Sequence, residues 1–236
     1  MKIIFSDLDG TLLLRGEKCL NKNIKNSIYK ILESGNMFSV ASGRNYIELR
    51  HFFREFADDI FFVCNDGSLA VYKEQTIFSV PMDKSMFHGF KEYTAHGKYV
   101  TYIKSDNRLN IRNAMKQYQS HVMIIDGIED INEDIYKISD MNKTIPCPLP
   151  VVYQNHSMNE YIADGADKGR AIEYIISILG IPPEYAYAFG DNYNDTGMFD
   201  ICATSYASVY AKPDIKKMTD KIAYNIEKEF NKIIGG

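Results

Sequence analysis

Four short apolar runs, each followed at once by a cluster of polar residues, constrain the fold of this chain more than any other feature. The runs are Lys2–Phe5, Met37–Ala41, Ile60–Cys64 and Tyr185–Phe189. Because they are mostly apolar and do not alternate with polar residues, they are typical of strands that are covered on both faces, as in a parallel sheet.

Apolar residues at helical spacing lie between these runs, at residues 24–32, 46–56 and 171–179. The first stripe is followed by Gly35 and the third by Gly180, and glycine commonly ends a helix. The alternation of strand and helix predicts an α/β fold with a doubly wound, mostly parallel sheet. Loops at the carboxyl ends of such strands gather at one edge of the sheet, so we expect the polar clusters to meet there.

The chain from about residue 79 to residue 160 breaks this pattern. It follows an expected hairpin of residues 69–72 and 76–80, and it contains an apolar stripe at helical spacing over Ser85–His96 (Met86, Phe90, Tyr93). Further short strands are expected at residues 99–104, 122–125 and 151–154, whereas 131–141 fit a helix or a strand equally. We therefore expect a catalytic core of residues 1–78 and 161–236, with an inserted α+β cap domain of residues 79–160.

Composition excludes several classes of partner. The chain has 27 Lys and Arg against 31 Asp and Glu, a net charge of −4, so it has no basic footprint for nucleic acid. It has neither an apolar run of about 18 residues, which would span a membrane, nor the pattern of a signal peptide. Its 4 cysteines are scattered, without a C-x-x-C pair. These observations predict a cytoplasmic protein with no membrane or nucleic-acid partner, and they set no oligomeric state.

The first polar cluster contains two carboxylates, Asp7 and Asp9, directly before Gly10. A turn at this glycine can direct the two carboxylates apart, so that one can act as a nucleophile and metal ligand while the other transfers a proton. The alternative is a loop that merely closes the strand, because Asp and Gly favour turns. The position directly after the first buried strand favours chemistry.

Two further clusters could bind an anion. Ser42, Gly43 and Arg44 follow the second run, where a hydroxyl and the backbone N–H groups opening a helix can cradle a phosphate. A plain helix cap is the alternative. Lys168 opens the helix that ends near residue 179, against the helix dipole, which indicates that its ammonium is needed there rather than merely solvated.

The last cluster, Gly190 to Asp195, follows the fourth run. Asp191 and Asp195 are four residues apart, a spacing that can place both carboxylates on one face where a helix begins. Mg²⁺ prefers such hard oxygen ligands and needs only one or two carboxylates. The alternative, two acids that stabilise a helix start, explains either acid but not the whole string.

Together the four clusters resemble the four motifs of the haloacid dehalogenase superfamily: D-x-D-G-T-[LV], a strand-end Ser or Thr, a Lys, and G-D-x-x-N-D. The phrases that carry the likeness are Ser6–Leu13, Ala41–Arg44, Asp167–Ile172 and Gly190–Met198. They look like the Cof-type subfamily, whose large cap is inserted between the second and third motifs. The resemblance spans the whole core and includes the position of the insert.

The resemblance implies a role for each matching residue. Asp7 would be the nucleophile that forms an aspartyl-phosphate, and Asp9 the general acid and base. Mg²⁺ would be held by the Asp7 carboxylate, the Asp9 backbone carbonyl and the Asp191 carboxylate. The remaining implied roles concern the phosphate: Ser42, Gly43 and Asn194 would bind its oxygens, Lys168 would neutralise its charge and pair with Asp7, and Asp195 would be an outer ligand or orient Lys168. A separate hypothesis rests on the position of Arg44 directly after Ser42 and Gly43: it would make a bidentate anion contact toward the substrate or the cap, with a surface salt bridge as the alternative.

These expectations describe an Mg²⁺-dependent phosphatase that acts on small phosphorylated metabolites such as sugar phosphates. One alternative is a phosphomutase of the phosphomannomutase type, which would return the phosphoryl group to the substrate. The other is a non-catalytic domain that carries phospho-Asp or senses a sugar phosphate. The candidate nucleophile is followed two residues later by Asp9, which a phospho-Asp receiver does not need, and this favours an enzyme.

Overall fold

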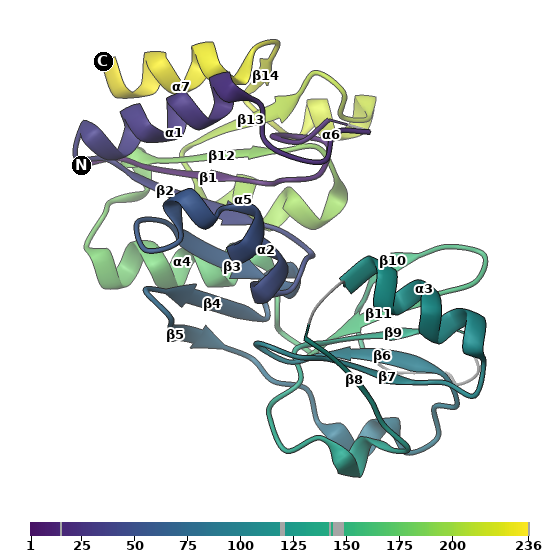
Figure 1. Cartoon of the computed structure of the whole chain (residues 1–236). Coiled ribbons are helices and arrows are strands. Elements are labelled where there is room, and N and C mark those ends of the chain that lie inside the picture. The colour runs from purple at the N-terminus through teal and green to yellow at the C-terminus, as the bar shows by residue number, and fades with distance from the viewer. Residues whose placement is uncertain (15, 119–120, 142, 144–148, 236) are drawn as a thin grey trace.

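The computed structural model describes residues 1–14, 16–118, 121–141, 143 and 149–235; Cys147 lies outside them. The described residues form two separate sheets, which lie at the top and at the lower right of Figure 1. We propose that the larger sheet, built from the first and last parts of the chain, belongs to a core domain, and that the sheet of the middle part belongs to a cap domain. In the described part of the chain, no helix is long and apolar enough to cross a membrane.

The core sheet has eight strands in the order β14-β13-β12-β1-β2-β3-β4-β5. The pairs from β14 to β3 are parallel, and the hairpin that joins β3 to β4 and β5 is antiparallel. The strands are β1 (Ile3–Ser6), β2 (Met37–Ala41), β3 (Phe61–Cys64), β4 (Leu69–Tyr72), β5 (Gln75–Ser79), β12 (Ala186–Gly190), β13 (Thr204–Ser208) and β14 (Lys221–Ala223). The predicted doubly wound, mostly parallel sheet is confirmed, and all four apolar runs form strands in it.

Helices cover both faces of this sheet, which explains why the four runs identified in the sequence are mostly apolar and do not alternate. In β1 the adjacent residues Ile4 and Phe5 are both fully buried, and they belong to apolar clusters on opposite faces. The helices on the face of Ile4 are α1 (Lys22–Glu33), α2 (Tyr46–Phe52) and α7 (Ile226–Gly235). Those on the face of Phe5 are α4 (Lys168–Leu179), α5 (Thr196–Ile201) and α6 (Pro213–Lys217).

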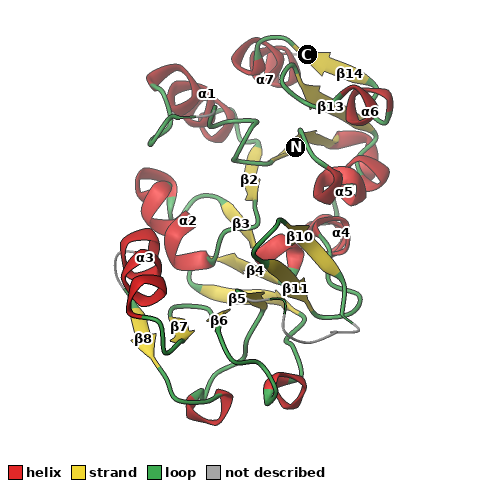
Figure 2. Cartoon of the chain, turned by 90° about the vertical axis from the view of Figure 1, so that its right-hand side faces the viewer, coloured by secondary structure: helices red, strands yellow, loops and turns green. Residues whose placement is uncertain are grey.

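The cap sheet has six strands in the order β10-β11-β9-β6-β7-β8, and each pair is antiparallel except β7 with β8. In Figure 2 its strands β6, β7 and β8 lie toward the bottom, whereas β10 and β11 overlap the core in this view. The helix α3 (Arg108–Tyr118) packs on β7 and β8. The strands are β6 (Tyr93–His96), β7 (Thr101–Lys104), β8 (Val122–Ile124), β9 (Lys137–Asp140), β10 (Val151–Gln154) and β11 (Asn159–Ile162).

The helical stripe expected over residues 85–96 is wrong. The structure has a 3₁₀ turn at Lys84–Phe87 and then the strand β6. Phe90 and Tyr93 do share one apolar cluster, as the stripe implied, but Tyr93 and Ala95 reach it as alternate residues of a strand. A four-residue strand contains only two repeats of the two-residue alternation. The helix-like spacing of the aromatic residues in this segment therefore outweighed the strand pattern.

The expected domain boundary between residues 160 and 161 falls inside β11, which pairs with β9 and β10 along its length. The cap also has a separate apolar cluster, which extends to Ala163 and Ala166. We therefore propose that the cap includes all of β11, so that the chain re-enters the core in the segment before α4.

The central cap strands place polar side chains mainly on one face, although Ile162, opposite Lys137, belongs to the apolar cluster. Ala95, Ile138 and Tyr161 face the apolar cluster of the cap. Their neighbours His96, Lys137, Ser139 and Glu160 lie on the opposite face, since successive side chains of a strand point to opposite sides. This polar face is turned to the core, because the Nζ atom of Lys137 donates to the backbone carbonyl of Gly43 at 2.7 Å.

Candidate active site

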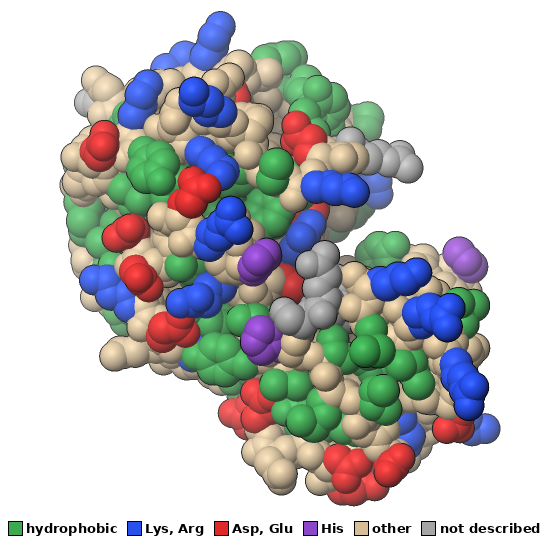
Figure 3. Space-filling model, viewed as in Figure 1, with side chains coloured by type: hydrophobic (Ala, Val, Ile, Leu, Met, Phe, Trp, Pro, Cys, Tyr) green, Lys and Arg blue, Asp and Glu red, His purple; other side chains and the backbone are tan. Residues whose placement is uncertain are grey.

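The loops after β1, β2, β3 and β12 meet at one edge of the core sheet and face the polar side of the cap sheet. Between them lies a cavity of about 430 Å³. In the space-filling view the two domains are two lobes with an indentation between them (Figure 3). The cavity is lined by Asp7, Asp9, Ser42, Gly43, Arg44, Asn45, Glu48, Asp66, His96, Lys137, Val152, Tyr153, Glu160, Asp191, Asn192 and Asn194.

Lys168, Asp7 and Asp195 form a buried charged triad at the floor of this cavity. Lys168 is fully buried at the start of α4, and its Nζ atom donates to Asp7 Oδ1 at 2.8 Å and to Asp195 Oδ1 at 2.6 Å. Burial opposes the charge of Lys168, yet Asp195 and Asp7 together raise the pKa of this amine above its ordinary value. Burial raises the pKa of Asp7 although Lys168 pulls it down. The ammonium is thus held charged between the two carboxylates.

Asp191 is the next carboxylate in the group. Burial, and then the charge of Asp195, raise the pKa of Asp191 to about 6. Oxygen atoms of Asp7, Asp191 and Asp195 lie within 4.8 Å of one another. Asp195 uses one oxygen for Lys168 and the other for the backbone N–H groups of Asp191 and Asn192. Asp7 and Asp191, which line the cavity, are therefore the carboxylates best placed to hold a cation.

Gly10 has a conformation and a position that only glycine fits. Its φ is +96°, in the left-handed region, and a Cβ atom there would lie 2.3 Å from Oδ2 of Asp191. The glycine of the first motif therefore lets the loop after β1 approach the loop after β12. This close approach brings together Asp7 and Asp191, which are far apart in sequence.

Asp9 and Arg44 form a bidentate pair at the mouth of the site. Arg44 donates from Nε to Asp9 Oδ2 at 2.8 Å and from Nη2 to Asp9 Oδ1 at 2.6 Å. The hydrogen bonds to Asp9 raise the pKa of Arg44. The Arg44 guanidinium also lies over the ring of Phe52, at 5.5 Å from its centroid. Its partner in this structure is thus the carboxylate of Asp9, which corresponds to the salt-bridge alternative, and an anion contact of Arg44 with the substrate stays a prediction.

Ser42, Gly43 and Asn194 line the same cavity. The Ser42 hydroxyl oxygen accepts from the backbone N–H of Arg44 at 3.3 Å. Asn194 Nδ2 donates to Asp66 Oδ1 at 2.8 Å. Although burial works against the charge of Asp66, Lys137 and Lys168 lower its pKa below the usual range.

Comparison with known proteins agrees with this geometry. A family model described as haloacid dehalogenase-like hydrolase matches residues 4–229. The chain belongs to this family. Among the relatives of this hydrolase is the 5-amino-6-(5-phospho-D-ribitylamino)uracil phosphatase YbjI of Escherichia coli, 24% identical over 230 residues, which cover 88% of this chain and 84% of the relative. The expected superfamily is therefore confirmed.

Solved structures show the same fold. A protein of Thermotoga maritima matches with a TM-score of 0.84 at 17% identity, covering 98% of this chain and 97% of that one. A sugar phosphatase of haloacid dehalogenase subclass IIB matches with a TM-score of 0.77 at 18% identity, covering 100% and 99%. The fold of this hydrolase, cap included, is thus similar along its whole length to known members of the family.

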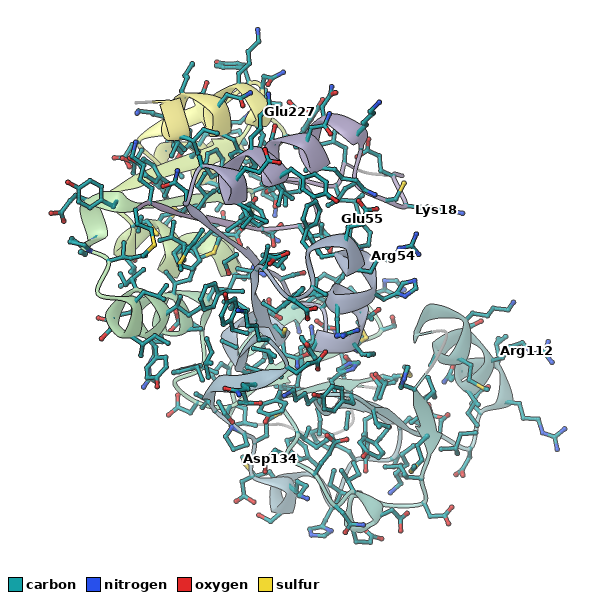
Figure 4. All side chains as sticks on the ribbon, turned by 60° about the vertical axis from the view of Figure 1, so that its left-hand side comes forward. Lys18, Arg54, Glu55, Arg112, Asp134 and Glu227 are labelled. Atoms are coloured by element: carbon teal, nitrogen blue, oxygen red, sulfur yellow. The ribbon has the colours of Figure 1, made fainter. Side chains whose placement is uncertain are left out.

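The sequence analysis assigned no role to several charged residues of the cavity. Asp66, in the loop after β3, and Glu48, in the first turn of α2, belong to the core. Lys137 and Glu160 come from the cap strands β9 and β11, and their charges are joined at 2.9 Å. The strand that carries Lys137 also contains Ser139 and Asp140, so its sequence gave no signal that singled out this lysine. By contrast, the labelled Lys18, Arg54 and Arg112 extend into solvent (Figure 4).

Proposed function

We propose that this hydrolase is an Mg²⁺-dependent phosphatase of small phosphorylated metabolites, such as sugar phosphates, and that it works through an aspartyl-phosphate on Asp7. One observation carries the proposal. The Asp7 carboxylate lines a polar cavity between the two sheets while it is paired with a fully buried ammonium and lies beside a second carboxylate that faces the same space.

Electrostatics explain why the nucleophile needs this setting. A carboxylate and a phosphate oxygen about 4 Å apart repel by about 4 kcal/mol at an effective dielectric constant of 20. Lys168 supplies one compensating charge next to Asp7. Phosphoryl transfer depends chiefly on such positioning and charge neutralisation. The cavity would supply both.

The residues present fit a magnesium ion. Asp7 and Asp191 offer hard carboxylate oxygens within 4.8 Å of each other, and both side chains line the cavity. The backbone carbonyl of Asp9 would be the third protein ligand. Bound there, Mg²⁺ would withdraw charge from the phosphate and reduce its repulsion by Asp7.

The chain's own residues would then perform two displacements. An Asp7 oxygen attacks phosphorus and the bond to the ester oxygen breaks, while Asp9 gives that oxygen a proton. Asp9 next takes a proton from a water molecule, which attacks phosphorus and releases Asp7 and inorganic phosphate. For the first step Asp9 must exchange its partner Arg44 for the leaving oxygen. Arg44 is then free to bind an anionic oxygen of the substrate.

Size and polarity support a small substrate. The cavity of about 430 Å³ is lined almost wholly by charged and polar side chains, with Val152 as an apolar exception. Ser42, Gly43 and Asn194 would hold the phosphate oxygens. The relative YbjI is by name a phosphatase of a phosphorylated ribityl compound. We also propose a cytoplasmic location, which the free thiols of Cys19, Cys64 and Cys202 support.

Hydrolysis of an aryl phosphate tests the function. We expect turnover with Mg²⁺, loss of turnover in EDTA, and recovery when Mg²⁺ is restored. On a hexose phosphate we expect inorganic phosphate and no isomer, which separates a phosphatase from a phosphomutase. Undiminished turnover in EDTA, or full activity of Asp7→Asn, would contradict the proposal.

A further inference from the structure

The cap residue Lys137 contacts the part of the cavity formed by Gly43 and Asn194, which we call the phosphate end. Lys137 lies on β9, and its Nζ atom donates to the backbone carbonyl of Gly43 at 2.7 Å, to Asp66 Oδ2 at 3.3 Å and to Glu160 Oε2 at 2.9 Å. Two of these three acceptors belong to the core. An ammonium has three N–H donors, so these contacts match its whole donor capacity.

Burial makes this arrangement informative. The Lys137 side chain is 7% exposed and that of Asp66 is 5% exposed. Two charges are removed from water at a domain interface, which is costly unless each charge is well paired. Because its donors already have acceptors, Lys137 is suited to hold core groups in place rather than to bind a substrate oxygen.

The core carboxylate that Lys137 contacts, Asp66, is in turn bonded to a proposed phosphate ligand. Asp66 accepts from Lys137 on one oxygen and from Asn194 on the other. Because a carboxylate only accepts, the Asn194 amide nitrogen must face Asp66, and this fixes the orientation of the amide. Asp66 also limits the space beside Gly43, where a Cβ atom would lie 3.0 Å from Asp66 Oδ2.

We propose that Lys137 and Asp66 are a positioning pair, through which the seated cap orients Gly43 and Asn194 at the phosphate end of the cavity. This inference rests on the proposed function, because it takes these two groups as phosphate ligands. Lys137 belongs to the cap, whose side chains would face the leaving group of the substrate. In this proposal it nevertheless makes no direct contact with that group.

The chain offers a matched control in a second lysine that links the domains. Lys98, also in the cap, donates from Nζ to the backbone carbonyl of Glu74 at 2.7 Å and to Thr76 Oγ1 at 3.1 Å. These acceptors belong to the core hairpin of β4 and β5, and neither Lys98 nor its acceptors line the cavity. Lys98→Met therefore removes a link between cap and core without touching the phosphate end.

Binding of inorganic phosphate, in the presence of Mg²⁺, is the decisive measurement. Phosphate has no leaving group, so its affinity reports on the core end of the cavity alone. Calorimetry should show phosphate binding weakened about tenfold by Lys137→Met and changed less than about twofold by Lys98→Met. Lys137→Arg, which keeps the charge and the donors, should recover part of the affinity. Equal affinity in Lys137→Met and the wild type would overturn the proposal.

A double-mutant cycle tests the pairing itself. Asp66→Asn should weaken phosphate binding, and Asp66→Asn combined with Lys137→Met should be no weaker than the worse single variant, because both changes break the same link. Additive losses would overturn the pairing. If Lys137→Met does not fold, as judged by thermal unfolding, Asp66→Asn and Lys137→Arg carry the same test.

The outcomes also separate this inference from the proposed function. A wild-type protein that binds phosphate but does not hydrolyse aryl phosphate contradicts the phosphatase and leaves the positioning pair testable by calorimetry. A wild-type protein that hydrolyses it, with unchanged phosphate affinity in Lys137→Met, contradicts only the pair. In the kinetics we expect kcat to fall together with the phosphate affinity, whereas a lost leaving-group contact would raise KM for larger esters alone.

Discussion

The core and the cap place their polar residues by different means. In the core, charged side chains stand in loops at the ends of strands that are buried on both faces, as Asp7 does after β1. In the cap they stand within strands, on the face opposite the apolar cluster, as Lys137 does in β9. A parallel sheet has no free face for polar groups, whereas an antiparallel sheet can keep one. Chemistry therefore appears as compact motifs in the first case and as scattered alternate residues in the second.

The two regions also treat buried charge differently. The core neutralises Lys168 within its own loops, with Asp7 and Asp195. Lys137 takes one partner, Glu160, from the cap and another, Asp66, from the core. The buried charge of Lys168 is thus paired within the core alone, whereas the pairing of Lys137 is complete only when the cap lies against the core. Four predictions test this contrast.

The largest effect should come from the core floor. Asp7→Asn removes the proposed nucleophile and should lower kcat/KM for aryl phosphate by about 10⁴-fold or more. The protein should still fold, since Asn has the same shape and Lys168 keeps Asp195 as a partner. Steady-state kinetics and thermal unfolding check both statements. A loss of activity that only tracks a loss of folded protein would argue against the chemical role.

A pair of glycines tests the contact between two core loops. Gly10→Ala would place a Cβ atom 2.3 Å from the Asp191 carboxylate and should lower kcat/KM about 100-fold by displacing it. Gly16 also has a positive φ, +94°, but a Cβ atom there meets nothing within 4 Å. Gly16→Ala should therefore cost about 1 kcal/mol of stability and leave kinetics nearly unchanged. Equal kinetic losses in the two variants would show that strain, not the Asp191 contact, matters.

The separate apolar clusters predict separate stabilities. Ile138 in the cap and Ile172 in the core are both fully buried, in different clusters. Either substitution to Ala should destabilise its own domain by about 3 kcal/mol. Hydrogen exchange should then speed up in cap amides for Ile138→Ala and in core amides for Ile172→Ala. Uniform acceleration through the whole chain in both variants would contradict the proposed two-domain division.

The smallest effect should concern acid stability in the cap. Burial, and then the charge of Lys137, lower the pKa of His96 to about 3, against about 6.5 in an unfolded chain. Between these values the unfolded state binds the extra proton, so stability is lost as pH falls below about 6.5. His96→Gln should remove about 2 kcal/mol of the loss between pH 7.5 and pH 5. Urea unfolding at the two pH values measures this. Identical pH dependence in both proteins would show that His96 is not the group responsible.

Much of the core could be predicted from local sequence. The run Met37–Ala41, apolar except for Ser39, has few alternatives to a buried strand, and Gly180 ends α4 with a φ of +62°, as a terminal glycine should. Three short cap strands were also predicted, because β7, β8 and β10 lie within the expected segments 99–104, 122–125 and 151–154, but β6 was not. β6 spans only four residues, and its strand period competed with helical spacing in the aromatic residues nearby. In such a segment tertiary packing, rather than local pattern, decides the structure.

The sequence by itself determined which residues carry charge and that the strand-end clusters share one edge of a sheet, because a parallel sheet orients all its carboxyl ends alike. Only the tertiary structure decided which charges pair. Arg44 turns to Asp9, and Lys137 crosses to Asp66, a residue 71 positions away in the chain. Which charges pair depends on distances of a few ångströms between them and on how much water each group loses on folding. Both arise only when two separately folded sheets are brought face to face.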